Sequence, residues 1–206
     1  MKHIAKIAAL FVACLSLPQD VAAQVRLEMA GKLALARNAA LHPAQKAELA
    51  AFRRSKDYYG AFYVSPRTGV SHGHAGASSL AAAKAIARMG CERQSRGPCT
   101  LHAVITPKST NIGPDGRIDL SGTVANVMEV RFRSLQRGRW TAFAMTPEGA
   151  WGAASNVARE RQAEAQAMRQ CRAAAAKARG NYPVAMSRVM AARGMFGCSP
   201  VLTLQK

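Results

Sequence analysis

The chain has 206 residues, a length that suits one or two domains. Its 29 lysines and arginines against 11 aspartates and glutamates give a net charge of +18, which favours anionic partners through long-range electrostatics. No stretch approaches the roughly 20 apolar residues of a membrane-spanning helix, so we expect no transmembrane segment.

Residues 1–23 have the features of a secretory signal peptide. Lys2 and Lys6 precede an apolar run at 7–17, and the sequence Val-Ala-Ala at 21–23 provides small residues before a cleavage site. The sequence therefore predicts a periplasmic or secreted protein that begins after residue 23. Cleavage removes two basic residues and one acidic residue. The remaining chain has 27 lysines and arginines against 10 aspartates and glutamates, a net charge of +17.

An earlier cleavage site is an alternative. The sequence Phe-Val-Ala-Cys at 11–14 loosely resembles the motif before a lipidated cysteine, which would make Cys14 a lipoprotein anchor. Cleavage after Ala23 instead removes Cys14 and leaves an even number of cysteines. In an oxidising compartment an even set predicts two disulfides. The four cysteines are Cys91, Cys99, Cys171 and Cys198.

Residues 24–56 are rich in alanine, leucine, lysine and arginine. Apolar residues recur there at the spacing of one helix face. They are Leu33, Ala36, Ala40, Leu49 and Phe52. The segment is predicted as one or two amphipathic helices, with His42-Pro43 between them.

The rest of the chain contains an internal repeat. The sequence AFYVSPRTG at 61–69 matches AFAMTPEG at 142–149. Further on, both copies carry Ala, Ala and Cys at i, i+4 and i+8, which places small residues along one helix face that can lie close to a sheet. At an offset of 80 residues, these are Ala83, Ala87 and Cys91 in the first copy and Ala163, Ala167 and Cys171 in the second.

Each copy is predicted as strand, strand, helix, strand. The expected fold class is α+β, with antiparallel strands packed by Ala-rich helices. The first copy spans 57–105 and the second 140–206, and we expect the two to pair into one unit. Ser78-Ser79 and Asn156 are the predicted caps of the two helices.

Each predicted helix ends in a cysteine and each closing strand begins with one. This favours the pairs Cys91–Cys99 and Cys171–Cys198, although four cysteines allow three connectivities.

Residues 106–139 are predicted as an inter-copy loop followed by a basic segment. Within this region the stretch 124–135 is ambiguous between strand and helix. In the second copy, 179–190 also resembles 96–105, an alternative alignment that would place no cysteine where Cys99 stands.

The repeated pattern resembles a known family. The pattern is an aromatic pair, Ala-Phe, Ser or Thr, Pro and Gly, then an Ala-rich helix ending in Cys and a strand led by Cys. It is similar to the bacterial exported domains of unknown function family 4189, in two tandem copies. The nearest local match is GAWGAAS at 149–155, and the resemblance covers about 57–105 and 140–204. It implies a small exported protein with paired cysteines, and it supplies no catalytic residues.

Two histidines in the first copy form a candidate metal site. On a strand His72 and His74 would share a face, and His102 on a neighbouring strand would add a third nitrogen, enough for a zinc site with an open position. A metal-dependent enzyme that uses these three histidines is one alternative function. The second copy has Gly152 and Ala154 at the positions of the first two, so histidines without a metal are the simpler interpretation.

No motif points to catalysis or to a cofactor. The sequence GHAGAS at 73–78 offers backbone N–H groups to an anion, but the full dinucleotide-binding pattern is missing. There is no GxSxG motif, and the favoured disulfides leave no free thiol. We expect no cofactor and favour a non-catalytic protein.

The most basic compact stretch is VRFRSLQRGRWTAF at 130–143. Arginines interleaved with aromatic residues can bind single-stranded nucleic acid, but in an exported protein an anionic envelope polymer or an acidic protein suits this surface better. The alternative is a basic edge strand that discourages edge pairing. With the second helix included, the predicted binding residues are Arg131, Arg133, Arg137, Arg139, Trp140, Arg159, Arg169 and Arg172.

The predicted function is therefore an exported, non-catalytic binding module for an anionic partner. Besides the metal-dependent enzyme, the other alternative is an inhibitor or immunity-type protein that blocks another protein. An inhibitor should hold its partner at high salt, because such an interface depends on buried apolar anchors.

Overall fold

The computed structural model describes residues 25–28, 31–36, 40–55, 57–108 and 118–206. The predicted signal peptide and Cys14 lie outside these residues. In chain order the elements are β1 (Val25–Glu28), β2 (Lys32–Leu35), α1 (Pro43–Ser55), β3 (Gly60–Val64), β4 (Ser71–His74), α2 (Leu80–Ser95), β5 (Thr100–Thr106), β6 (Ile118–Ser121), α3 (Gly122–Arg133), β7 (Trp140–Met145), β8 (Trp151–Val157), α4 (Glu160–Gly180), α5 (Val184–Ala192) and β9 (Ser199–Gln205). None of the helices in the described part of the chain is long and apolar enough to cross a membrane.

The predicted α+β fold is confirmed by two antiparallel sheets packed with helices. The first copy has a four-stranded sheet of order β2-β5-β3-β4. Helix α2 covers one face, where Ala83 and Ala87 pack against Ala61 of β3. Helix α1 covers the other face through Phe52, whose ring lies 5.5 Å from that of Phe62. The small-residue stripe of α2 thus brings the helix close to the sheet, as predicted.

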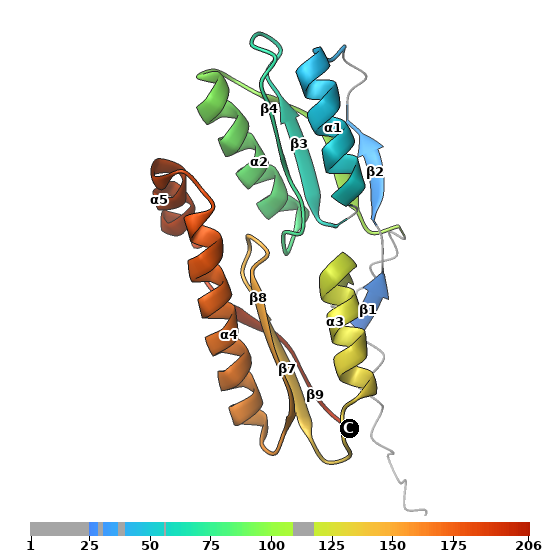
Figure 1. The fold of residues 1–206 in the computed structure, drawn as a ribbon. Coiled ribbons are helices and arrows are strands. Elements are labelled where there is room, and N and C mark those ends of the chain that lie inside the picture. Colours follow the sequence, from blue (N-terminus) through green and yellow to red (C-terminus); the bar gives the residue numbers. More distant parts are fainter. Residues whose placement is uncertain (1–24, 29–30, 37–39, 56, 109–117) are drawn as a thin grey trace, which may run out of the picture.

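The second copy repeats this arrangement around a three-stranded sheet of order β8-β7-β9. Helix α4 packs on one face through Ala163 and Ala167, which contact Ala142 of β7. Helix α3 covers the opposite face, where Met128 packs with Phe143. Each sheet therefore lies between two helices (Figure 1).

The two copies share an irregularity in their strand pairing. In the first copy Phe62 lies opposite Ala103, and the register then shifts so that His102 has no partner across the ladder. In the second copy Phe143 lies opposite Leu202, and the register shifts at the same point. A β-bulge bends its strand and re-aims the side chains beside it. A bulge at matching positions supports the interpretation of these segments as two copies of one unit.

The two copies pack against each other but do not share a sheet. Their sheets are separate and lie end to end (Figure 1), because the turn between β7 and β8 packs against the end of the first copy. There the amide of Ser78 donates a hydrogen bond to the carbonyl of Pro147 at 3.1 Å. Helix α5 also reaches the first copy, where Met186 and Met190 pack on Ile86 of α2.

The segment 24–56 is only partly helical. Helix α1 confirms its second half, but β1 and β2 replace the helix predicted around Leu33. Strand β2 pairs with β5, so that Leu33 lies opposite Ile105 and Leu35 opposite Ala103. This non-local pairing overrides the helical spacing of the apolar residues.

The region between the copies, 106–139, contains β6 and α3 as well as connecting segments. Strand β6 pairs in parallel with β1. The ambiguous stretch 124–135 is mostly helical, as part of α3. A strand and a helix precede each copy, but only the helices α1 and α3 are equivalent: β2 joins the first copy's sheet beside β5, whereas β6 pairs with β1 in a separate two-stranded sheet. The structural repeat is longer than the similarity in sequence indicates.

The two disulfides follow the favoured pairing. Cys91 is bonded to Cys99, and Cys171 to Cys198. The alternative alignment of 179–190 with the closing strand is wrong, because most of that stretch belongs to α5. Helix α5 is an insertion of the second copy, and it lengthens the loop that the second disulfide closes.

Loss of the second disulfide should destabilise the protein more than loss of the first. The cysteines are 27 residues apart in the second and 8 in the first, for which loop-closure entropy gives about 3.5 and about 2.5 kcal/mol. Cys91 and Cys171 are equally buried, whereas Cys99 is buried and Cys198 only half-buried, so packing losses do not favour the expected order. Urea unfolding of the two double Cys→Ala variants should show a difference of about 1 kcal/mol. Equal values would contradict the loop-entropy explanation.

One predicted helix cap is confirmed and the other is wrong. The amide of Ala82 donates to the hydroxyl of Ser79 at 3.2 Å, which caps α2. Helix α4 begins after Arg159, and Asn156 lies in β8 with a φ of 58°. The side-chain oxygen of Asn156 accepts a hydrogen bond from the amide of Gln136 at 2.8 Å. Asn156 therefore fixes the turn before β7 and does not cap the helix.

Candidate functional site

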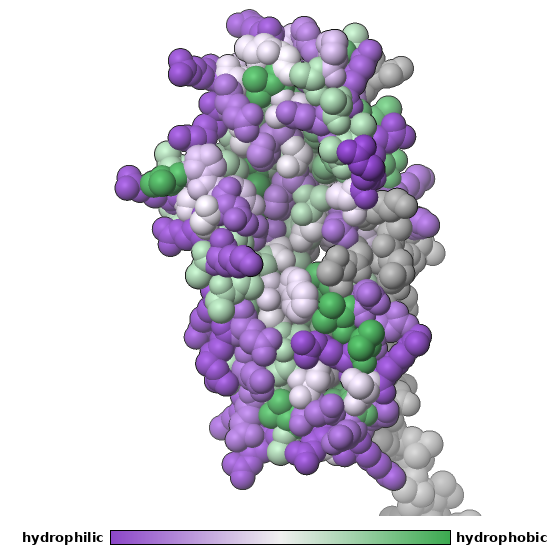
Figure 2. Space-filling model, in the orientation of Figure 1, coloured by the Kyte–Doolittle hydropathy of each residue, from purple (hydrophilic) through white to green (hydrophobic). Residues whose placement is uncertain are grey.

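A cleft opens where the two copies meet. Its volume is about 770 Å³, which is in the range of small-molecule sites. One wall comes from Tyr59 and residues 74–78 of the first copy, and the other from residues 148–151 and from Lys177 and Asn181 of the second. Figure 2 shows pale and green side chains at the junction of the two halves, beside the purple flank formed by α4.

Glu148 lies in this cleft and is fully engaged within the protein. Its carboxylate accepts hydrogen bonds from the hydroxyl of Tyr182 at 2.8 Å and from the amide of Ala150 at 3.1 Å. Its backbone carbonyl accepts one from Nε2 of His74 at 2.9 Å. Burial and the nearby carboxylate raise the pKa of Tyr182, so the phenol stays a donor. Glu148 therefore holds the β7–β8 turn against the first copy.

The three histidines predicted as a metal site do not come together. His72 lies on β4 and faces α2, where its ring occupies the space beside Gly90, and His74 shares that face. His102 lies in the bulge of β5, with its ring 6.4 Å from that of Phe62 on the α1 side of the sheet. The sheet separates them. Within the described ranges, no three His, Cys, Asp or Glu side chains are grouped to hold a metal ion.

His72 and His74 have structural roles. Nδ1 of His72 lies 3.3 Å from the amide nitrogen of Gln94 on α2, and His74 links the two copies through Glu148. Burial lowers the pKa of both imidazoles below the ordinary value of 6.5, so both are neutral near pH 7.

The four arginines of the stretch 131–139 are divided between α3 and the turn that follows it. On α3, Arg133 forms an ion pair with Glu129, and Arg131 donates to the hydroxyl of Ser155 at 3.3 Å. The other two lie on the turn. The alternative of a single basic edge strand is therefore wrong, and half of these arginines are already engaged.

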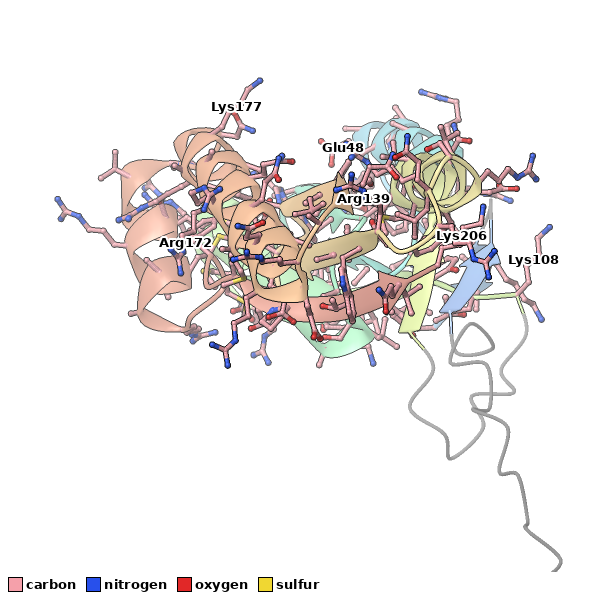
Figure 3. The ribbon with its side chains drawn as sticks, turned by 90° about the horizontal axis from the view of Figure 1, so that it is seen from below. Glu48, Lys108, Arg139, Arg172, Lys177 and Lys206 are labelled. Atoms are coloured by element: carbon pink, nitrogen blue, oxygen red, sulfur yellow. A yellow bond between two sulfur atoms is a disulfide. The ribbon has the colours of Figure 1, made fainter. Side chains whose placement is uncertain are left out.

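Trp140 is not a fully exposed stacking surface. It is half-buried at the start of β7 and packs with Ala142 and the other small residues under α4. Its neighbour Arg139 lies apart from Arg172 of α4 in Figure 3. The basic residues predicted for binding thus do not form one continuous face.

The remaining predicted arginines lie at the start of α4 or on its exposed faces. Lys177, farther along the helix, projects in a different direction from Arg172 (Figure 3). We call the arginine set the α4 basic surface: Arg159, Arg161, Arg169 and Arg172. Across the described part of the chain, no carboxylate forms an ion pair with these arginines or with Lys177.

Sequence reasoning did not identify the cleft. It assigned no binding role to Glu148, Trp151 or Lys177, all of which line the cavity. The available signal was the difference between the copies: Glu148 stands where the first copy has Arg67, and Trp151 where it has Ser71. That difference does not reveal that the second turn docks on the first copy.

Comparisons of the chain with protein-family models, with curated proteins and with solved structures give no match. The description of the molecule therefore rests on its own structure. It is an α+β protein of two copies, each with one internal disulfide, and a cleft lies between the copies. The resemblance to family 4189 stays a prediction.

Proposed function

We propose that this protein is an exported, non-catalytic binding module that recognises an anionic partner through the α4 basic surface. The partner is an anionic envelope polymer or an acidic protein. The observation that carries the proposal is the set of exposed cations on α4 without a carboxylate partner in the described ranges. Two disulfides support a location in an oxidising compartment.

The construction of α4 supports this role. Its buried line of Ala163, Ala167 and Cys171 packs on the sheet, so its charged residues lie on the outer faces. The disulfide to Cys198 ties the helix to β9. Arginines on a rigid element are partly preorganised, which reduces the entropy lost on binding. Their guanidinium groups also match carboxylate and phosphate geometry.

Removal of two arginines from the α4 basic surface should weaken capture of the partner. Each cation facing an anionic surface contributes about 1 kcal/mol, so Arg169→Gln with Arg172→Gln should lower affinity by about 30-fold. Capture by the wild type should also fall between about 0.15 M and about 1 M salt, because screening shortens the Debye length. The measurement is capture from envelope extract, with disulfides intact, at both salt concentrations.

A control variant removes the same charge from arginines that are already paired. Arg88 and Arg133 form ion pairs with Glu92 and Glu129, so their replacement by glutamine should leave capture unchanged. Equal losses in the two variants would refute a specific role for α4. Capture of a single protein that resists about 1 M salt would instead favour the inhibitor alternative.

A further inference from the structure

We infer that the cleft between the two copies binds a carboxylate-bearing sugar ring, which identifies the anionic partner as an acidic polysaccharide. This inference rests on the proposed function, because it names the chemistry of the anionic partner. It also adds a second contact region, distinct from the α4 basic surface.

Aromatic side chains form part of both walls of the cleft. Trp151 is half-buried, and its ring lies 5.9 Å from that of Phe143. Because Phe143 is fully buried in the core of the second copy, it holds the indole in place. Tyr59 lines the cleft from the first copy. Rigid aromatic rings with apolar faces and polar edges suit a ligand that is itself apolar on its faces and polar at its edge, as a sugar ring is.

The cleft also holds donors that no described residue satisfies. Lys177 and Asn181 are exposed, and they lie four residues apart, so they share one side of α4 at its C-terminal end. Two carboxylates also line the cleft: Glu148 is bonded to Tyr182 and Ala150, and Asp57 has an interaction of its own within the protein. The ammonium and amide are therefore free to bind a ligand carboxylate by charge-assisted hydrogen bonds.

Small residues leave the space between these groups open. Gly76, Ala150, Ala174 and Ala178 line the cavity of about 770 Å³. Ser78 also lines the cavity, and its hydroxyl lies 3.5 Å from the carbonyl oxygen of Pro147. Hydrogen-bonding groups interspersed with aromatic rings favour a ring with hydroxyls over a fatty acid, whose chain needs a continuous apolar surface.

The cleft and the α4 basic surface lie on one helix. Lys177 follows Arg169 by eight residues, about 12 Å along the axis. Because Lys177 and Arg172 project in different directions (Figure 3), a polymer with one ring in the cleft would reach the arginines by winding around α4. An anionic polysaccharide accounts for both regions with a single ligand.

The fluorescence of Trp151, which lines the cleft, reports binding in the test. The chain has two tryptophans, so Trp140→Phe leaves Trp151 alone. Titration with trigalacturonic acid should change the Trp151 fluorescence, whereas maltotriose, a neutral trisaccharide, should bind at least about tenfold more weakly, a difference of about 1.4 kcal/mol. Calorimetry on the wild-type chain with both trisaccharides checks that Trp140→Phe has not altered the site.

Matched lysine variants locate the site. Lys177→Gln should lower the affinity for trigalacturonic acid by about tenfold, because one charge-assisted contact of about 1.4 kcal/mol is lost. Lys177→Arg should keep most of the affinity. Lys46→Gln, an exposed lysine on α1, should have no effect. Decanoate, a fatty acid, serves as a further comparison ligand. The inference would be overturned if trigalacturonic acid does not bind, if maltotriose binds equally well, or if decanoate binds more tightly. It would also be overturned if the Lys177→Gln variant binds trigalacturonic acid as tightly as the wild type does.

The same variants separate this inference from the proposed function. If Arg169→Gln with Arg172→Gln weakens capture of the envelope partner while trigalacturonic acid does not bind the cleft, the inference fails and the proposed function stands. If neither the envelope partner nor trigalacturonic acid binds, both fail.

Discussion

Replacement of Gly152 by alanine should destabilise the protein by about 3 kcal/mol or more, at or above the upper end of the usual cost of overpacking. Gly152 lies on β8 beneath α4, and a Cβ there would overlap the amide nitrogen of Cys171 and the carbonyl oxygen of Ala167. These are backbone atoms, so no side chain can rotate away, and the disulfide to Cys198 restrains the helix. Urea unfolding of the variant measures the effect.

Two other glycines serve as controls. A Cβ at Gly180 meets nothing within 4 Å, so Gly180→Ala should be neutral or slightly stabilising. A Cβ at Gly90 would meet the ring of His72, a side chain that can shift, so Gly90→Ala should have an intermediate cost. If Gly90→Ala and Gly152→Ala cost the same, the backbone overlap at Gly152 is not the cause.

The comparison of these glycines also explains His72. In the first copy the strand carries His72 and the helix carries Gly90, whereas in the second copy the strand carries Gly152 and the helix carries Gln170. Helix and strand approach closely in both copies. The glycine that allows this approach lies on the helix in the first copy and on the strand in the second. His72 is therefore a packing residue of the first copy, which is why the second copy does without it.

Much of the fold follows from local patterns in the sequence. The alanines at i and i+4 and the cysteine at i+8 predicted two helices that pack closely on sheets, and the disulfide pairs followed from one cysteine on each helix and one before each closing strand. These features could be predicted because residues on one helix face recur every three or four positions. Such a pattern can be recognised without knowing which distant residues are in contact. The prediction that the helices end at these cysteines is wrong, because α2 continues past Cys91 and α4 past Cys171.

Non-local pairing limited the rest. Leu33 has helical spacing to its neighbours, yet it pairs with Ile105 across β2 and β5, and nothing near Leu33 in the sequence encodes that partner. The β-bulge at His102 is a similar case: a shift of one residue changes the face of the sheet to which a side chain points. The three-histidine site depended on a regular strand there, so spacing alone misplaced His102.

The cleft could not be predicted because its walls come from residues far apart in the chain. Tyr59 and Lys177 line the same cavity, and they meet only because the β7–β8 turn docks on the first copy. The sequence repeat identifies the two turns as equivalent, but they have different partners. The first turn is held by Gln45 of α1, whose amide donates to the carbonyls of Ser65 at 2.9 Å and Val70 at 3.0 Å.

The second large effect is expected at Gly149, in the β7–β8 turn of the second copy that packs against the first copy. Its φ of 117° lies in the region that favours glycine, and a Cβ there would overlap the carbonyl oxygen of Gly76. Gly149→Ala should therefore cost about 3 kcal/mol, from backbone strain together with overlap between the copies. Gly138 is the matched control, because its φ is 71° but a Cβ there meets nothing within 4 Å. Gly138→Ala should cost only the strain, about 1 kcal/mol.

Hydrogen exchange can show whether the copies separate in the Gly149→Ala variant. The amide of Ser78 in the first copy donates to the carbonyl of Pro147 in the second, whereas the amide of Glu148 donates to Met195 within the second copy, both at 3.1 Å. The Ser78 amide should exchange faster in Gly149→Ala than in Gly138→Ala, because separation of the copies exposes it to water, while the Glu148 amide reports opening of the turn itself. Equal exchange and equal stability in the two variants would contradict docking through this turn.

The same variant tests whether the cleft depends on the docked arrangement. Its walls belong to different copies, so Gly149→Ala should abolish the response of Trp151 to trigalacturonic acid. The α4 basic surface lies entirely within the second copy and should keep its salt-sensitive affinity for the polymer. If trigalacturonic acid binds Gly149→Ala as tightly as the wild type, the sugar contacts only one copy, and the docking of the copies serves stability rather than recognition.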